Sequence, residues 1–176
     1  MMTMQKITPN LWFDNQAEEA VNFYITVFEN SSIIRTTHFG KEGFEIHKMP
    51  EGMIMTIEFE LAGQKFVALN GGPVFKLNEA VSFIITCETQ DEVDYYWNTL
   101  SEGGDEKSQQ CGWLKDKFGL SWQVVPAILP DLMADKDREK TDRVMGAMLQ
   151  MKKINIKGLQ EAYNGISQSE EESVLA

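Results

Sequence analysis

Few side chains in this chain could carry out chemistry. Its two histidines, His38 in RTTHFG and His47 in EIHKMP, fall near a predicted strand end and in a predicted loop. They could hold a metal or exchange protons, although isolated histidines in such places usually make structural hydrogen bonds. Cys111 could act as a nucleophile if a base or a positive field promoted its thiolate. No histidine or arginine is near it in sequence, and the nearest bases are Lys107, Lys115 and Lys117. A buried, unreactive thiol is therefore the simpler interpretation of Cys111, although Gly112 beside it leaves room for a ligand.

Composition and charge limit the partners. The chain has 176 residues with 16 Lys and Arg against 27 Asp and Glu, a net charge of −11. Such a charge repels phosphate backbones, so we expect neither nucleic acid nor an anionic membrane as a partner. The apolar runs are too short to span a bilayer, and the first residues lack the build of a signal peptide, so a cytoplasmic location is expected. Two cysteines in such a chain predict reduced thiols.

Two helices repeat along the chain. In NQAEEAVNFYITVFEN the residues Ala17, Ala20, Val21, Tyr24, Val27 and Phe28 mark one buried helical face, with Asn15 and Glu18 as a predicted capping pair. In TQDEVDYYWNTLSEGG the pattern returns 72 residues later, behind the pair Thr89 and Glu92. A short β-prone run precedes each helix and further strand patterns follow it, so each half is predicted to be a β-α-β-β-β unit.

The remaining sequence completes the predicted organisation. We expect a first module over residues 1–75, a second over 76–128, C-terminal helices over 129–165 and a disordered acidic tail over 166–176. In the second module, Asp116 and Gly119 predict a tight turn between two strands. One stripe of the C-terminal helices is predicted to form a core or dimer face: Val144, Met145, Met148, Leu149 and Met151.

Four segments carry a family resemblance: PNLWFDNQAEEAVNFY, FVALNGGPVFKLNEAVSF, CGWLKDKFGLSWQVVP and AMLQMKKINIKGLQEAYNG. Together they resemble the PhnB-like branch of the vicinal oxygen chelate superfamily, which includes glyoxalase I, extradiol dioxygenases and antibiotic-resistance proteins. The resemblance implies an α+β fold, with two βαβββ modules of the glyoxalase-like kind followed by C-terminal helices. It also makes a homodimer the expected assembly. The branch is often labelled 3-demethylubiquinone methyltransferase, but the sequence has no glycine-rich turn for a nucleotide after its first strand.

The resemblance also indicates where a metal would sit. Metal-using relatives place His or Gln early in the first strand of each module and Glu in its last strand. The corresponding positions here are Pro9 or Asn10, Val67 or Ala68, Ser82, and Gln123. None is a histidine or a carboxylate, so neither a metal nor any other cofactor is predicted.

In the family geometry these substituted positions would still face a cleft. Asn10, Ser82 and Gln123 would offer neutral hydrogen bonds and Trp12 and Trp113 aromatic walls, with Cys111 nearby. Strand alternation places Trp122 and Gln123 on opposite faces, and we expect Gln123 to face the cleft. These residues suit a small, weakly polar organic ligand. A metal-dependent lyase or dioxygenase with relocated ligands, and a structural or interaction domain, remain alternatives, so whether the chain is an enzyme stays open.

Overall fold

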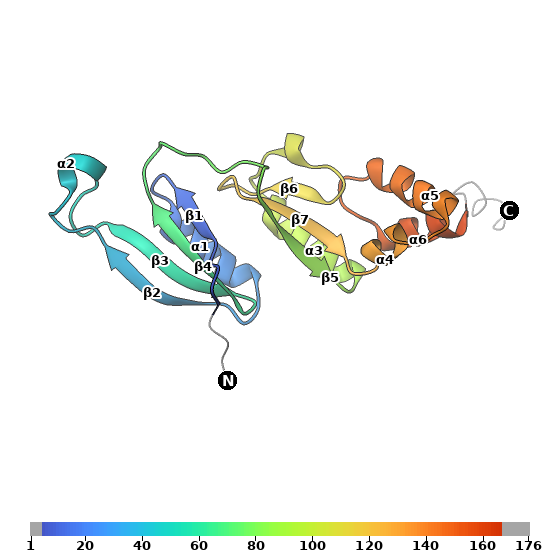
Figure 1. Cartoon of the computed structure of the whole chain (residues 1–176), viewed down its shortest axis with the longest axis horizontal. Coiled ribbons are helices and arrows are strands. Elements are labelled where there is room, and N and C mark those ends of the chain that lie inside the picture. The colour runs from blue at the N-terminus through green and yellow to red at the C-terminus, as the bar shows by residue number, and fades with distance from the viewer. Residues whose placement is uncertain (1–4, 167–176) are drawn as a thin grey trace. The chain divides into compact units, whose positions relative to one another are not determined.

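The computed structural model describes residues 5–166, and its chain divides after Asn78 into two compact units, each described here by itself. The first unit contains β1 (Asn10–Phe13), α1 (Ala17–Val27), β2 (Ser32–His38), α2 (Phe44–His47), β3 (Ile54–Leu61) and β4 (Gln64–Asn70) (Figure 1). The second contains β5 (Ser82–Cys87), α3 (Gln90–Ser101), the 3-10 helix η1 (Glu106–Ser108), β6 (Trp113–Lys115), β7 (Ser121–Pro126), α4 (Leu129–Met133), α5 (Arg138–Leu149) and α6 (Ile156–Asn164).

The first unit is a four-stranded sheet, sheet A, covered on one face by α1. Its strand order is β1-β4-β3-β2, with β1 parallel to β4 and the other pairs antiparallel. The predicted face of α1 is buried, and it packs on alternate residues of β3 and β4, among them Ile57, Phe59 and Ala68. The opposite face of sheet A carries no helix of its own unit, and polar side chains remain there.

The predicted cap of α1 is wrong. The residue that caps the helix is Gln16, which makes no side-chain capping bond, and the first-turn N–H of Ala17 instead donates to Oδ1 of Asn70 at 2.9 Å. The amide of Asn70 also donates to the carbonyl of Ile54 at 3.0 Å. The buried side chain of Asn70, at the end of β4, therefore provides the capping bond that the sequence pattern assigned to Asn15.

The second unit repeats the start of the first. In sheet B the order is β5-β7-β6, with β5 parallel to β7 as β1 is parallel to β4. Helix α3 has the predicted capping box of Thr89 and Glu92, and it buries Val93, Trp97 and Leu100. The two-module α+β fold predicted from the sequence is thus confirmed.

The second sheet is smaller than the first. The predicted β-α-β-β-β pattern has three strands in the second unit, because residues 106–108 form η1 and β6 begins only at Trp113. Gly104 packs so closely on the carbonyl of Lys115 that a Cβ there would lie 2.0 Å from it. This close approach diverts the segment from an extended path.

The C-terminal helices have a core of their own. Leu129, Leu132, Val144, Ile154 and Leu159 are buried together, with Met148 and Met151 packed against them. The predicted apolar stripe is therefore divided, because Met145 and Leu149 are exposed and Met151 lies beyond the end of α5. The predicted acidic tail lies outside the described residues from 167 onward.

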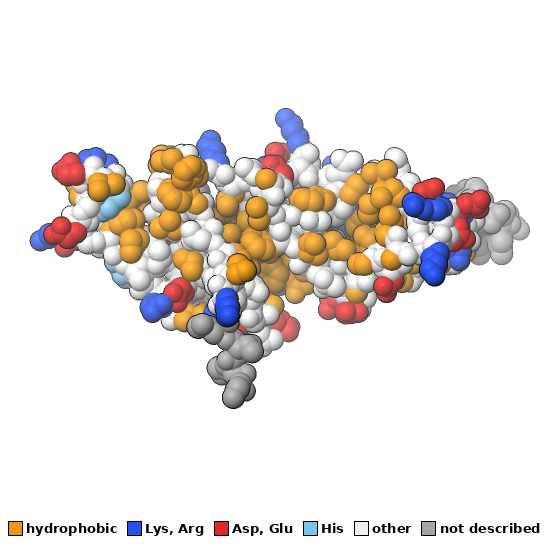
Figure 2. Space-filling view, viewed as in Figure 1, with side chains coloured by type: hydrophobic (Ala, Val, Ile, Leu, Met, Phe, Trp, Pro, Cys, Tyr) orange, Lys and Arg blue, Asp and Glu red, His pale blue; other side chains and the backbone are white. Residues whose placement is uncertain are grey.

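Two features of the structure relate to nucleic-acid and membrane partners: the distribution of surface charge and the length of the helices. On the face seen in Figure 2, basic side chains are scattered among acidic ones and do not form a continuous basic surface. Among the helices of residues 5–166, none is both long and apolar enough to cross a bilayer.

Candidate functional site

The helix-free face of sheet A aligns polar side chains in rows. Strand pairing places Asn10 opposite Val67, Val67 opposite Glu58, and Glu58 opposite Arg35. Paired residues share a face of the sheet, so these four form one row across all four strands. The next row is Trp12, Leu69, Thr56 and Thr37, in which the two threonine hydroxyls lie 2.6 Å apart.

A cavity of about 390 Å³ opens beside the first row. It is lined by Thr8, Ile34, Glu58, Lys65, Phe66 and Val67. Arg35 donates to Glu58 Oε1 at 2.5 Å, and both side chains are partly exposed, so the pair contributes little to stability. Val67 was considered from the sequence as a metal-ligand position, but Thr8, Ile34, Glu58 and Lys65 were not predicted as part of a site. The only signal for the carboxylate was the alternation of IEFE in β3, which leaves Glu58 and Glu60 on the face away from α1.

Trp12 lies in the second row, but it is not an open aromatic wall. Its indole N–H donates to the carbonyl of Gly72 at 2.8 Å, and its ring meets Phe75 edge-on at 4.9 Å. A Cβ at Gly71 would lie 2.3 Å from this ring. The segment that follows β4 therefore covers Trp12, which explains the glycine at position 71.

The face of sheet B away from α3 brings three predicted residues together. Gln123 Nε2 donates to Ser82 Oγ at 2.8 Å, and Gln123 pairs directly with Trp113 and Ile84. Ser82 lies opposite Ser121, just as Asn10 lies opposite Val67 in sheet A. The position that corresponds to Val67 is therefore Ser121, and Gln123 lies one row further along the sheet. Trp122 is buried on the other face against Phe83, as alternation predicted.

Lys115 joins this face from β6. Its pairing partner is Ser121, and its ammonium group forms an ion pair with Glu79. Hydrogen bonding from Lys115, followed by the backbone of Glu79 itself, lowers the pKa of the Glu79 carboxyl.

Cys111 has a backbone role. Gln110 and Trp113 exchange both backbone hydrogen bonds, so Cys111 and Gly112 form a two-residue turn with φ of 52° and 83°. Positive φ at both positions is what a type I′ turn requires. The N–H groups of Cys111 and Gly112 donate to the carbonyls of Met151 and Lys152, each at 2.8 Å, which fastens the loop between α5 and α6 to the sheet.

The histidines do not form a shared site. His47 Nδ1 accepts from the N–H of Met49 at 2.9 Å, and its Nε2 lies 3.2 Å from the carbonyl of Glu42. Both ring nitrogens thus have backbone partners, in the pattern of the neutral Nε2–H tautomer. His38 lies at the exposed end of β2.

The Asp116 turn is built as predicted. Asp116 Oδ1 accepts from the N–H groups of Phe118 and Leu120, and Oδ2 accepts from the Trp122 indole at 2.8 Å. Gly119 has φ of 88°. Although Asp116 is buried, its hydrogen bonds are to donors within the turn and to the neighbouring core, so its role is structural.

Neither sheet face offers the donors of a divalent metal site. The cavity on sheet A has one carboxylate, Glu58, and a repelling ammonium group, Lys65. Sheet B presents serine, glutamine and lysine. Within residues 5–166, no three His, Cys, Asp or Glu side chains gather as metal ligands would. The residues present do not fit the metal of the superfamily's enzymes.

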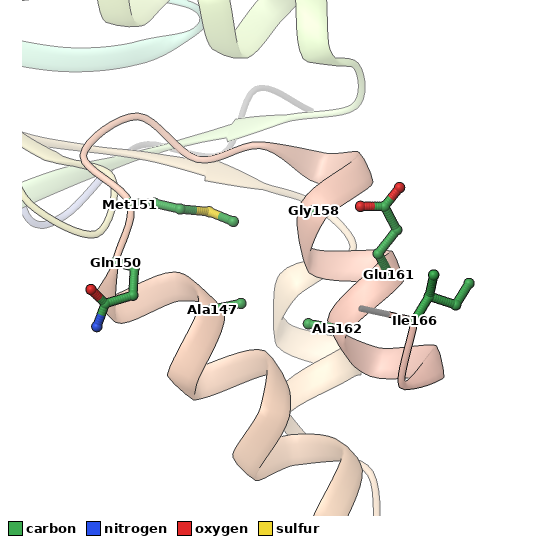
Figure 3. Close-up of a pocket in the computed structure, with 7 residues that line it drawn as sticks. All are labelled: Ala147, Gln150, Met151, Gly158, Glu161, Ala162 and Ile166. Carbon is green, nitrogen blue, oxygen red and sulfur yellow. The ribbon is translucent and has the colours of Figure 1, made fainter. Parts of the chain in front are cut away.

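A second hollow, of about 400 Å³, lies between α5 and α6. Figure 3 shows Ala147 and Ala162 pointing toward each other and Met151 reaching from the end of α5 toward α6, while Glu161 points away. Small side chains create this hollow, and polar groups do not converge in it. It therefore lacks the oriented polar contacts of a ligand site.

Comparison with known protein families identifies the family of this chain. The family described as 3-demethylubiquinone-9 3-methyltransferase matches residues 5–125. The chain belongs to this family. This PhnB-like branch of the vicinal oxygen chelate superfamily is the one the four segments predicted. No curated protein matches the chain.

One solved structure supports the PhnB-like assignment, and others are similar to the chain. The PhnB protein from Bacillus cereus, to which the same methyltransferase name is provisionally attached, is 34% identical with a TM-score of 0.59, over 70% of this chain and all of that one. A Staphylococcus aureus protein is 30% identical with a TM-score of 0.32, over 70% of this chain and 97% of its own. Protein PA1353 from Pseudomonas aeruginosa shares the fold at 19% identity, with a TM-score of 0.52, over 70% of this chain and 98% of its own.

The family match does not cover the C-terminal helices, and the family's methyltransferase name does not describe a site in this chain. The family match ends at Val125, so helices α4, α5 and α6, and with them the fourth quoted segment, lie outside it. The methyltransferase name is only a label, and the turn from β1 to α1, Asp14 to Gln16, contains no glycine to approach a nucleotide phosphate.

Proposed function

We propose that this PhnB-like protein binds a small, weakly polar organic molecule on the helix-free face of sheet A, without a metal. The observation that carries the proposal is the cavity of about 390 Å³ beside the row of Asn10, Val67 and Glu58. Its volume falls within the usual range for ligand sites, roughly 300 to 1,000 Å³. Ile34 and Val67 offer an apolar surface, and Glu58 offers an acceptor for a hydroxyl or amine of the ligand.

The test is a thermal-shift and calorimetric screen of aromatic, quinone-like and short aliphatic compounds, with S-adenosylmethionine included. A ligand at about 100 times its Kd should add roughly 2.7 kcal/mol of stability. Ile34→Trp fills the cavity and should abolish the shift, while Ile33→Trp on the same strand lies outside the lining and should not.

Three results would contradict this proposal. An equal loss of binding in both tryptophan variants would remove the cavity from the argument. A stoichiometric metal that is lost on substituting Glu58 would favour a metal-dependent enzyme. No binding by any compound would favour a structural or interaction domain.

Homodimerisation is part of the proposal. Met145 and Leu149 lie one helical turn apart on α5 and are 37% and 50% exposed. Such an exposed apolar pair suits contact with a second copy. Sedimentation should show a dimer that Met145→Glu with Leu149→Glu dissociates, and a monomeric parent chain would refute it.

A further inference from the structure

A row of hydrogen-bond donors crosses sheet B from edge to edge. Ser82 on β5 pairs with Ser121 on β7, and Ser121 pairs with Lys115 on β6. The neighbour of Ser121, Trp122, packs on the opposite side of the sheet, so the three side chains of the row share the face away from α3. Two hydroxyls and an ammonium group in line form a donor set suited to an anion.

The side-chain hydroxyl of the middle member has no hydrogen-bond partner within residues 5–166. Ser121 is 1% exposed, and among the described residues nothing bonds its Oγ. A buried hydroxyl without a partner destabilises a fold, and the neighbouring positions of the core are filled with apolar residues. The serine is therefore not explained by packing and is available to donate to a bound group.

Lys115 is already in contact with a carboxylate. Its partner Glu79 lies before the start of β5, outside the sheet, and the Glu79 side chain is 52% exposed while that of Lys115 is 22% exposed. An exposed partner can exchange with a competing anion at little cost, because a surface ion pair is weak. Glu79 thus occupies the place that a ligand's anionic group would take.

The next row supplies an apolar surface beside these donors. It consists of Trp113, Gln123 and Ile84, and Ile84 is 62% exposed. Gln123 donates to Ser82 Oγ and so leaves the Ser82 hydroxyl proton free to turn toward a ligand. A molecule with an anion at one end and an aromatic or aliphatic body would match both rows.

We propose that Ser82, Ser121 and Lys115 bind the anionic group of a small organic acid, which displaces Glu79 from Lys115. The site lies in the second unit and goes beyond the neutral ligand proposed for sheet A. Because Glu79 holds Lys115 in this structure, opening of that ion pair accompanies binding.

The test is titration of the full chain at low ionic strength with benzoate, phenyl phosphate and benzamide, followed by calorimetry and amide NMR shifts. Benzoate should bind and the neutral benzamide should not. Glu79→Gln should tighten benzoate binding by about threefold or more, since it removes the internal competitor. Ser121→Ala should weaken it by about threefold or more, and Lys115→Gln should abolish it.

Matched controls separate this site from charge in general and from sheet A. Lys153 forms an ion pair with Asp94 in the same unit, and Lys153→Gln should leave benzoate binding unchanged. Ile34→Trp should also leave it unchanged, so the two proposals can fail independently. Ser121→Ala is expected to unfold at the same temperature as the parent chain or higher, which verifies its folding.

The outcomes decide the proposal. Binding of phenyl phosphate without benzoate supports the row and assigns a phosphoryl group to it. Equal binding of benzoate and benzamide, no binding by either the parent chain or Glu79→Gln, or equal effects of Lys115→Gln and Lys153→Gln would overturn it.

Discussion

Asn70 lies 53 residues after Ala17 and accepts its backbone N–H through Oδ1 at 2.9 Å, so the last strand of sheet A caps the first helix. The same amide donates to Ile54 at 3.0 Å, which links α1, β3 and β4 through one buried side chain.

Replacing this amide should destabilise the first unit. Asn70→Ala leaves the N–H of Ala17 and the carbonyl of Ile54 without partners and should lower the free energy of unfolding by about 2 to 3 kcal/mol. Asn15→Ala, at the position that the sequence pattern favoured as the cap, should change it by less than about 0.5 kcal/mol. Urea denaturation of both variants measures the difference, and similar losses would contradict the capping role of Asn70.

Asp116 offers a second test of buried hydrogen bonding. Asp116→Ala removes the acceptor of Phe118, Leu120 and the Trp122 indole, so we expect a loss of about 3 kcal/mol. Asp105 accepts the N–H of Lys107 in a similar turn, but it is exposed, and Asp105→Ala should cost less than about 1 kcal/mol. Tryptophan fluorescence during urea unfolding reports both values. A small effect at Asp116 would show that solvent can replace its donors.

Two glycines should respond to alanine with opposite signs. At Gly104 a Cβ would lie 2.0 Å from the carbonyl of Lys115, so Gly104→Ala should cost at least about 2 kcal/mol. At Gly146, within α5, the added methyl meets nothing within 4 Å, and Gly146→Ala should stabilise the helix by up to about 1 kcal/mol. Thermal unfolding of the pair gives the signs, and a harmless Gly104→Ala would disprove the close approach to Lys115.

The two thiols should differ in reactivity and in their effect on alkaline stability. Burial, with a smaller contribution from Glu92, raises the pKa of Cys87 from 9.0 to about 11. The folded protein therefore holds this proton more tightly than the unfolded chain. The resulting stability is present below pH 9 and is lost as the pH rises toward 11. Cys111 is half-buried, so iodoacetamide should modify it before Cys87.

Mass spectrometry after timed alkylation measures that order, and urea midpoints between pH 8 and 11 measure the loss of stability. In Cys87→Ala the alkaline loss should become smaller. Rapid alkylation of Cys87 in the folded chain, or an unchanged alkaline profile in the variant, would contradict its burial.

Local sequence patterns determined much of this protein. The spacing of Val93, Trp97 and Leu100 fixed α3 and its buried face, and Asp116 with Gly119 fixed the turn before β7. These features depend on hydrogen bonds and side-chain periodicity within a few residues, so they can be read along the chain. The repeat of strand and helix after 72 residues was readable for the same reason, whereas the family was inferred from the resemblance of four whole segments.

The tertiary structure decided which side chains share a surface. Glu58 becomes part of a ligand-sized cavity only because β3 pairs with β4 and β4 with β1, and Ser121 meets Ser82 and Lys115 only through the register of sheet B. From the sequence, Trp12 was expected to form an aromatic wall of the cleft. In the structure the segment after β4 covers it. Strand register and long-range contacts depend on residues tens of positions apart, and a shift by one residue reverses the face that a side chain occupies. Local sequence patterns therefore determined the fold, whereas pairing between distant strands determined which side chains lie on each sheet face.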